Sequence, residues 1–201
     1  MNSNYKRGRL LREIQKAQEN ENVELDWSGK EITELPEEIG QLSSLHTLNL
    51  SGNSLADLPD SIRLETLDVS TNQLTQVPDA IEQLQNLKKL HLTQNNLTVV
   101  PGTLGNLPCL TRLSLDRNQL KFIPTEIGQL VNLSELFLAH NQLTDIPPEL
   151  GQLRQLTILY LYQNQLTTIP NELGELAALR ELYLHQNHLV TIPSTLGQLT
   201  E

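Results

Sequence analysis

The 23 residues from Leu156 to Ala178 are LTILYLYQNQLTTIPNELGELAA. Blocks of the same pattern begin at five other leucines, namely Leu64, Leu87, Leu110, Leu133 and Leu179. A shorter copy begins at Leu45 and a divergent one at Asn22. Self-similarity at a fixed period of this length is typical of solenoids, in which each repeat buries its apolar face against its neighbours. The pattern therefore predicts one elongated repeat domain.

The shared pattern is L-x-x-L-x-L-x-x-N-x-L-x-x-I-P-x-x-L-G-x-L-x-x, which resembles the leucine-rich repeat. The resemblance covers about 180 of the 201 residues. The I-P-x-x-L-G-x-L half resembles the intracellular, Ras-group type found in Scribble and Erbin scaffolds, plant disease-resistance-like domains and bacterial Roco proteins. It implies an α/β solenoid, a horseshoe with a curved parallel sheet on its concave face, and a function in protein binding.

Two parts of the chain are expected. Residues 1–21 form a capping helix, and residues 22–201 form eight repeats, of which the second is shortened. Leu10, Leu11, Ile14 and Ala17 fall on one helical face, which should cover Trp27 of the first repeat. The second copy, residues 45–63, lacks the G-x-L portion, so a local kink or a thinner core is expected there.

Within each repeat, leucines at positions 1, 4 and 6 bracket a short strand with alternate side chains inward. An asparagine occupies position 9 of seven repeats: Asn53, Asn72, Asn95, Asn118, Asn141, Asn164 and Asn187. A buried amide at this turn can satisfy backbone groups of two neighbouring repeats. We therefore expect an asparagine ladder along the solenoid, with Lys30 replacing its first member.

Composition narrows the class of partner. The formal charge is −10, and an acidic surface disfavours nucleic acid. The basic residues of 1–16 are explained by solvation of the capping helix, with a weak contact to anionic lipid as the alternative. A single cysteine, no secretory signal and no apolar run long enough to span a membrane predict a cytoplasmic protein.

The concave face carries the candidate binding site. Four of the seven aromatic residues fall on strand positions of the last three repeats. Strands lie about 4.8 Å apart, so the rings should form one patch. The expected patch comprises Phe137, Tyr160, Tyr162, Tyr183 and Ile158, rimmed by His140 and His185. Aromatic anchors with a polar rim are typical of interfaces. The alternative is cross-strand stacking that only stabilises the sheet.

Basic residues occupy the concave-face positions of the repeats next to this patch. We call them the basic band: Lys88, Lys89, His91, Arg112 and Arg117. The first repeats carry acids, so the face runs from acidic to basic to aromatic. Such a pattern could steer a partner. Salt bridges between adjacent repeats explain it equally well.

Asp68, His91 and Ser114 share position 5 of consecutive repeats, in the order of a hydrolase triad. The open surface and the absence of a G-x-S-x-G turn argue against catalysis. No cofactor or metal is predicted, because His140 and His185 lack a ligand cluster.

The sequence thus predicts a non-enzymatic scaffold or adaptor in intracellular signalling, which binds a protein through its concave face. The alternative is a regulatory module split or truncated from a larger signalling enzyme such as a Roco GTPase; a serine hydrolase is the remote one. The chain ends at Glu201 without a capping segment. A truncated product, a homodimer through this end, and a tolerated short edge all stay open.

Overall fold

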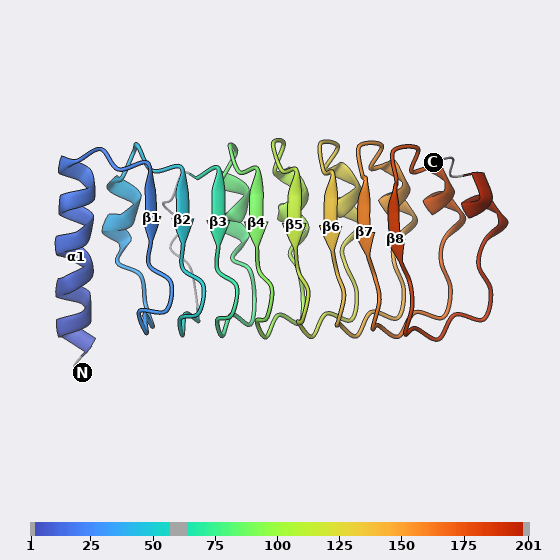
Figure 1. The fold of residues 1–201 in the computed structure, drawn as a ribbon, viewed down its shortest axis with the longest axis horizontal. Coiled ribbons are helices and arrows are strands. Elements are labelled where there is room, and N and C mark those ends of the chain that lie inside the picture. The colour runs from blue at the N-terminus through green and yellow to red at the C-terminus, as the bar shows by residue number, and fades with distance from the viewer. Residues whose placement is uncertain (1–2, 57–63, 199–201) are drawn as a thin grey trace.

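The computed structural model describes residues 3–56 and 64–198. One helix, α1 (Ser3–Glu19), precedes a single eight-stranded parallel sheet with strand order β1 to β8. The strands are β1 (Glu24–Asp26), β2 (Thr47–Asn49), β3 (Thr66–Asp68), β4 (Lys89–His91), β5 (Arg112–Ser114), β6 (Glu135–Phe137), β7 (Ile158–Tyr160) and β8 (Glu181–Tyr183). Figure 1 shows them side by side along the long axis, with α1 at one end. The predicted curved parallel sheet is confirmed.

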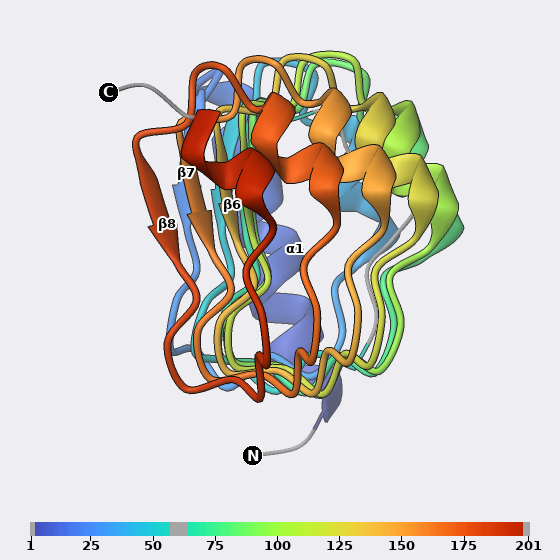
Figure 2. The ribbon, with the colours of Figure 1, turned by 90° about the vertical axis from the view of Figure 1, so that its right-hand side faces the viewer.

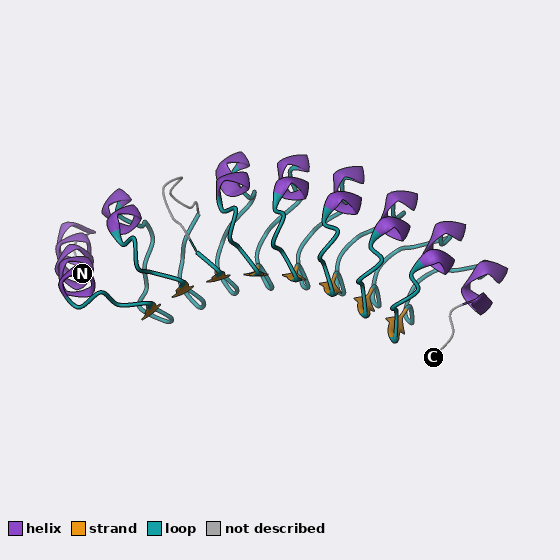
Figure 3. Cartoon of the chain, turned by 90° about the horizontal axis from the view of Figure 1, so that it is seen from above, coloured by secondary structure: helices purple, strands orange, loops and turns teal. Residues whose placement is uncertain are grey.

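Each return segment that the structure describes contains a short 3-10 helix instead of a long α-helix. These are η1 (Glu37–Gln41), η2 (Asp79–Gln83), η3 (Gly102–Asn106), η4 (Thr125–Gln129), η5 (Pro148–Gln152), η6 (Asn171–Glu175) and η7 (Ser194–Gln198). A proline in extended conformation precedes each of η1 to η6, which fixes the entry to the turn. In Figure 3 the helices line the outer side of an arc and the strands its inner side.

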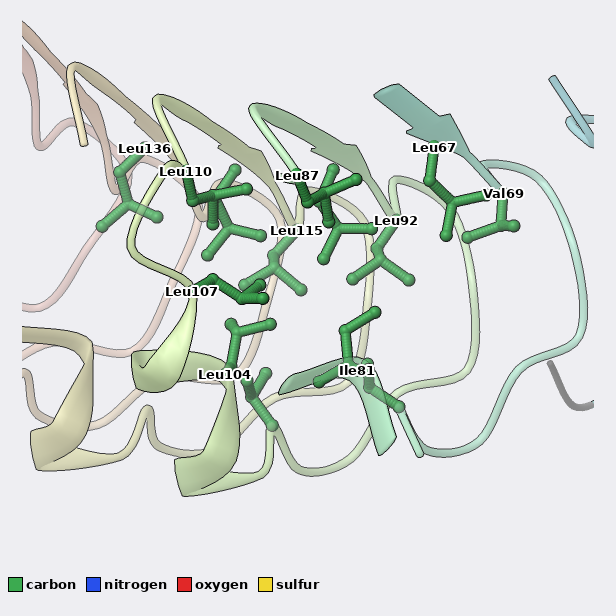
Figure 4. Close-up of a cluster of buried hydrophobic side chains, with 14 of the residues drawn as sticks. Leu67, Val69, Ile81, Leu87, Leu92, Leu104, Leu107, Leu110, Leu115 and Leu136 are labelled. Atoms are coloured by element: carbon green, nitrogen blue, oxygen red, sulfur yellow. The ribbon is translucent and has the colours of Figure 1, made fainter. Parts of the chain in front are cut away.

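Figure 2 shows the strands on one side of the solenoid and the 3-10 helices on the other. The core between them is a continuous stack made mostly of leucines, part of which Figure 4 shows. Apolar side chains within and beside the strands point into it, as Leu110, Leu113 and Leu115 do around β5. Close stacking also fixes the glycine of the return segment. A Cβ atom on Gly128 would lie 2.5 Å from the carbonyl oxygen of Glu149 in the next repeat, so only glycine fits.

The asparagine ladder is confirmed. In Asn141 the side-chain amide donates to the carbonyls of Leu115 and Leu138, at 3.0 and 3.1 Å, and its oxygen accepts the backbone N–H of Leu120 at 3.1 Å. Asn53 makes the corresponding bonds at the N-terminal end, where its oxygen accepts the N–H groups of Lys30 and Ile32. Each amide thereby joins two repeats.

The N-terminal helix covers the first repeat as predicted. Leu10, Ile14 and Ala17 are buried in one cluster with Trp27, whereas Leu11 is half-buried. Lys30 also contacts this helix, which the repeat pattern does not predict. Its ammonium lies 2.9 Å from a carboxylate oxygen of Glu13 on α1 and 5.9 Å from the centre of the Trp27 ring.

The shortened second repeat keeps its place in the sheet, since β2 and β3 pair in the regular parallel register. The kink expected in this repeat falls in residues 57–63, which lie outside the described residues. Residues 199–201 at the C-terminal end also lie outside them. In the last repeat Val190 and Ile192 are 86% and 63% exposed. Their counterparts in the preceding repeat, Thr167 and Ile169, are exposed and buried respectively.

Candidate binding surface on the concave face

Position 5 of consecutive repeats forms a row across the concave face, because the strands pair without register shift. Phe137 lies opposite Tyr160, and Tyr160 lies opposite Tyr183. The ring centroids are 5.0 Å apart in the first pair and 4.7 Å in the second, both edge-to-face at 88°. This is a preferred aromatic geometry, in which the positive edge of one ring meets the negative face of the next.

A second row follows just beyond the ends of the strands. The Tyr162 and His185 rings stack at 4.7 Å with an interplanar angle of 7°, and His140 meets Tyr162 at 5.3 Å. A contact of 6.0 Å between Tyr160 and Tyr162 joins the two rows. We call these six residues the aromatic platform: Phe137, His140, Tyr160, Tyr162, Tyr183 and His185. The structure thus brings the predicted aromatic residues together.

The members of the platform differ in exposure, and this corrects one expectation. Phe137 is only 9% exposed, so it is a buried member of the platform and not the exposed anchor that was expected. The Arg112 guanidinium covers it, with Cζ 4.7 Å from the ring centroid. Tyr183 is 43% exposed, His185 is exposed, and Tyr160, Tyr162 and Ile158 are half-buried. The accessible part therefore lies on β7, β8 and the turns after them.

Tyr160 is also held by a polar contact. Its hydroxyl donates a hydrogen bond of 2.8 Å to Oε2 of Glu181 on the next strand. This bond, assisted by the negative charge of Glu181, raises the pKa of Tyr160 to about 12. The central ring of the platform is therefore neutral and fixed in orientation at physiological pH.

The five residues of the basic band differ in their partners and in their charge. Lys88 and Arg112 form ion pairs with the neighbouring repeats, to Glu65 at 2.9 Å and to Glu135 at 2.6 Å. For these two, salt bridging between repeats is the better explanation. Desolvation lowers the pKa of His91, which keeps its ring neutral near pH 7. Lys89 and Arg117 are exposed and form no ion pair within the described part of the chain.

Position 8 of the repeat lies in the turn that follows the strand. Arg117 and His140 both have φ of 55°, in the left-handed region, and Gly29 and Gly52 occupy the same position of the first two repeats. Left-handed φ suits glycine and strains other residues. The side chains of Arg117 and His140 therefore rim the concave face at the turn.

Sequence reasoning missed Asp116, which lies between the basic band and the platform. Its Oδ1 accepts a 2.7 Å hydrogen bond from the backbone N–H of Ala139 on the next repeat. Burial raises the pKa of this carboxyl to about 6, against the lowering effects of that bond, Arg117 and Arg112. A signal was present: the preceding repeats carry serine or threonine at this position.

The proposed triad is only partly assembled. Ser114 Oγ lies 3.2 Å from Nδ1 of His91, and Ser114 is 5% exposed. The carboxylate of Asp68 instead accepts the backbone N–H of Ser70 at 2.9 Å. None of the hydrogen bonds between described residues joins Asp68 to His91. The geometry thus lacks the bond that would orient the histidine.

Within the described residues, no group of three or more histidine, cysteine or acidic residues is placed to hold a metal ion. No helix within residues 3–56 and 64–198 has the length and apolar character to cross a membrane.

Comparison with known proteins identifies the family. Models described as leucine rich repeat match residues 62–120 and 131–189, and a further one matches residues 44–63. These matches cover more than half of the sequence, and the chain therefore belongs to the leucine-rich repeat family. Its fold is one typical of non-enzymatic protein interaction. None of the curated protein sequences gives a significant match.

Solved structures show the same solenoid. A leucine-rich repeat protein of Leptospira interrogans is 35% identical with a TM-score of 0.80, over 92% of this chain and 55% of that one. The plant peptide hormone receptor RGFR1, in complex with RGF2, is 30% identical with a TM-score of 0.70, over 87% and 34%. A chain in the octameric complex of Latrophilin 3, Unc5D and FLRT2 is 26% identical with a TM-score of 0.75, over 86% and 57%. The chain thus spans about a third to a little over half of these proteins. Family and fold together support a protein-binding role.

Proposed function

We propose that the protein binds a protein partner on the concave face of β6 to β8, with Tyr160, Tyr162 and Tyr183 as the main contacts. The aromatic platform is the observation that carries the proposal. Its residues occupy positions that the leucine core does not use, and they form one connected cluster at the surface. Aromatic side chains with a polar rim are over-represented among the residues that dominate binding energy.

Two similar structures support this choice of function. The plant receptor binds a peptide hormone, and the octameric complex includes the leucine-rich repeats of FLRT2. The exposed cations beside the platform, Lys89 and Arg117, would then act on the rate of association more than on affinity.

The wider role proposed is that of a cytoplasmic scaffold or adaptor in signalling, without enzymatic activity. The resemblance to intracellular repeats and the single cysteine support it. Fractionation of cells that express the tagged full chain tests the location. Recovery from the cytosolic fraction is expected, and recovery from the medium or membrane fraction would contradict it.

The binding proposal is tested by affinity capture from lysate of the source cells. The double variant Tyr162→Ala/Tyr183→Ala is compared with wild type and with Thr47→Ala/Thr66→Ala, a matched pair on the concave face of β2 and β3. All three should have the same circular dichroism spectrum. A protein retained by wild type and by the threonine variant, but reduced about tenfold or more by the tyrosine variant, is expected. Equal retention by all three would overturn the proposal.

A further inference from the structure

One carboxylate-and-ring arrangement occurs twice on the concave face. Strand β6 carries Glu135 and Phe137, two residues apart, and β8 carries Glu181 and Tyr183 at the same two positions. In β6 the arrangement holds a cation, because Arg112 from the preceding strand forms a 2.6 Å ion pair with Glu135. The same guanidinium lies over the Phe137 ring at 4.7 Å.

The copy on β8 lacks its cation. Arg112 lies directly opposite Glu135 in the sheet, and the residue directly opposite Glu181 is Ile158. Neither Arg180 nor His185 forms an ion pair with Glu181 among the described residues. Oε2 of Glu181 accepts the Tyr160 hydroxyl, and this leaves Oε1 without a bond in the described chain. The Tyr183 ring is 43% exposed, against 9% for Phe137.

We propose that Glu181 and Tyr183, with Tyr160 beside them, form a seat for an arginine side chain of the protein partner. The inference rests on the proposed function and adds the chemistry that the platform recognises. A guanidinium suits the seat because it can donate to the carboxylate while its plane lies on a ring. Arg112 shows that the geometry of this sheet accommodates that pair of contacts. The net charge of −10 also favours a basic segment of the partner.

The test uses the full chain and a small probe, N-acetyl-arginine amide, followed by NMR of the tyrosine ring protons at low ionic strength. Saturable shifts of the Tyr183 and Tyr160 signals are expected. N-acetyl-citrulline amide has the same shape without the charge, so it should bind about tenfold more weakly or not at all. Equal shifts with both probes, or none with the arginine probe, would overturn the inference.

Three variants and one control sharpen the test. Glu181→Gln should weaken binding of the arginine probe about tenfold, and Glu65→Gln, a control one residue before β3, should leave it unchanged. Ile158→Arg should supply the missing guanidinium from within the chain and abolish the response. Arg112→Ile should empty the β6 copy and create a second site, seen as new shifts of the Phe137 ring. If Glu181→Gln or Ile158→Arg binds the probe like wild type, or Arg112→Ile gains no site, the account of the seat is wrong.

The outcome separates this inference from the binding proposal. If Tyr162→Ala/Tyr183→Ala loses the captured partner and Glu181→Gln keeps it at wild-type affinity, the platform binds the partner and the arginine seat fails. If the tyrosine variant keeps the partner, the binding proposal itself fails, whatever the probe shows. Parallel losses in Glu181→Gln and Ile158→Arg support both.

Discussion

The two halves of the concave face share one frame and use their exposed side chains differently. In the first half, Asp26, Asn49 and Asp68 occupy position 5, and each accepts the backbone N–H two residues later, at 2.9, 3.0 and 2.9 Å. In the second half Phe137, Tyr160 and Tyr183 occupy position 5 and contact one another instead. The apolar core and the asparagine ladder continue beneath both.

The difference shows which exposed side chains form hydrogen bonds that the fold itself needs. The short polar residues of β1 to β3 satisfy their own turns, as Asn and Asp side chains commonly do. The hydrogen bond from the Ser28 backbone, for example, holds the pKa of Asp26 below its usual range. Tyrosine rings cannot serve that purpose. Those of β7 and β8 contact one another instead, and the role proposed for them is recognition.

The largest loss of stability is expected when the asparagine ladder, which both halves share, is disrupted. Asn141→Ala removes an amide that bonds Leu115, Leu138 and Leu120, and leaves these buried backbone groups unsatisfied. The free energy of unfolding should fall by about 3 to 5 kcal/mol. Asn86→Ala, at an exposed asparagine, should change it by about 0.5 kcal/mol or less. Urea denaturation measures both, and similar values for the two variants would refute the ladder's role.

A smaller contrast is expected within the platform. Phe137→Ala removes a buried ring between Arg112 and Tyr160, and should cost about 3 kcal/mol. Tyr183→Ala, at the exposed end, should cost about 1 kcal/mol or less. Thermal unfolding distinguishes them. Equal losses would mean that both rings serve the fold, which would remove the basis for treating Tyr183 as a recognition residue.

Asp116, at the junction of the two halves, predicts a dependence on pH. Its folded pKa of about 6 is above the ordinary 3.8, so folding binds a proton between these values, and the stability this confers is lost as pH rises from 3.8 through about 6. Asp116→Asn keeps an acceptor for the Ala139 N–H without the buried charge. It should therefore stabilise the fold by about 2 kcal/mol at pH 8 and by almost nothing near pH 3.5. A gain independent of pH would contradict this cause.

The smallest loss of stability is expected in the first half, at the side chains that accept the backbone N–H groups of their own turns. Asp68→Ala leaves the Ser70 N–H without its acceptor and should cost about 1 kcal/mol. Asp68→Asn should stay close to wild type, because Asn49 makes the same bond in the preceding repeat. Chemical denaturation of the three proteins checks the series. A loss as large in Asp68→Asn as in Asp68→Ala would show that charge, rather than the hydrogen bond, is what matters there.

The repeated part of the fold was predictable because the same sequence pattern occurs in every repeat. Leucine spacing defines the core, Asn141 and its counterparts define the ladder, and constant register places Phe137, Tyr160 and Tyr183 in one row. The contacts that side chains make across neighbouring repeats were not predictable. The burial of Phe137 depends on how Arg112 crosses from β5, and the pKa of Asp116 depends on its desolvation.

Backbone conformation at single positions was also beyond the sequence pattern. Position 8 falls in the left-handed region in every repeat, and only the first two repeats signal this with glycine. Threonine, glutamine, arginine and histidine follow at the same place. Their side-chain chemistry suggested a surface on the strands, whereas the asparagine ladder holds them in a turn.

The central claim is that the aromatic half, and not the polar half, meets the partner. Site-specific photo-crosslinking tests it most directly, with a benzophenone side chain placed at the position of Tyr183 or of Asn49, which share position 5 of their repeats. Illumination in lysate of the source cells should give a discrete covalent adduct from the Tyr183 position and none from the Asn49 position. The same adduct from both, or one from the Asn49 position alone, would contradict the account.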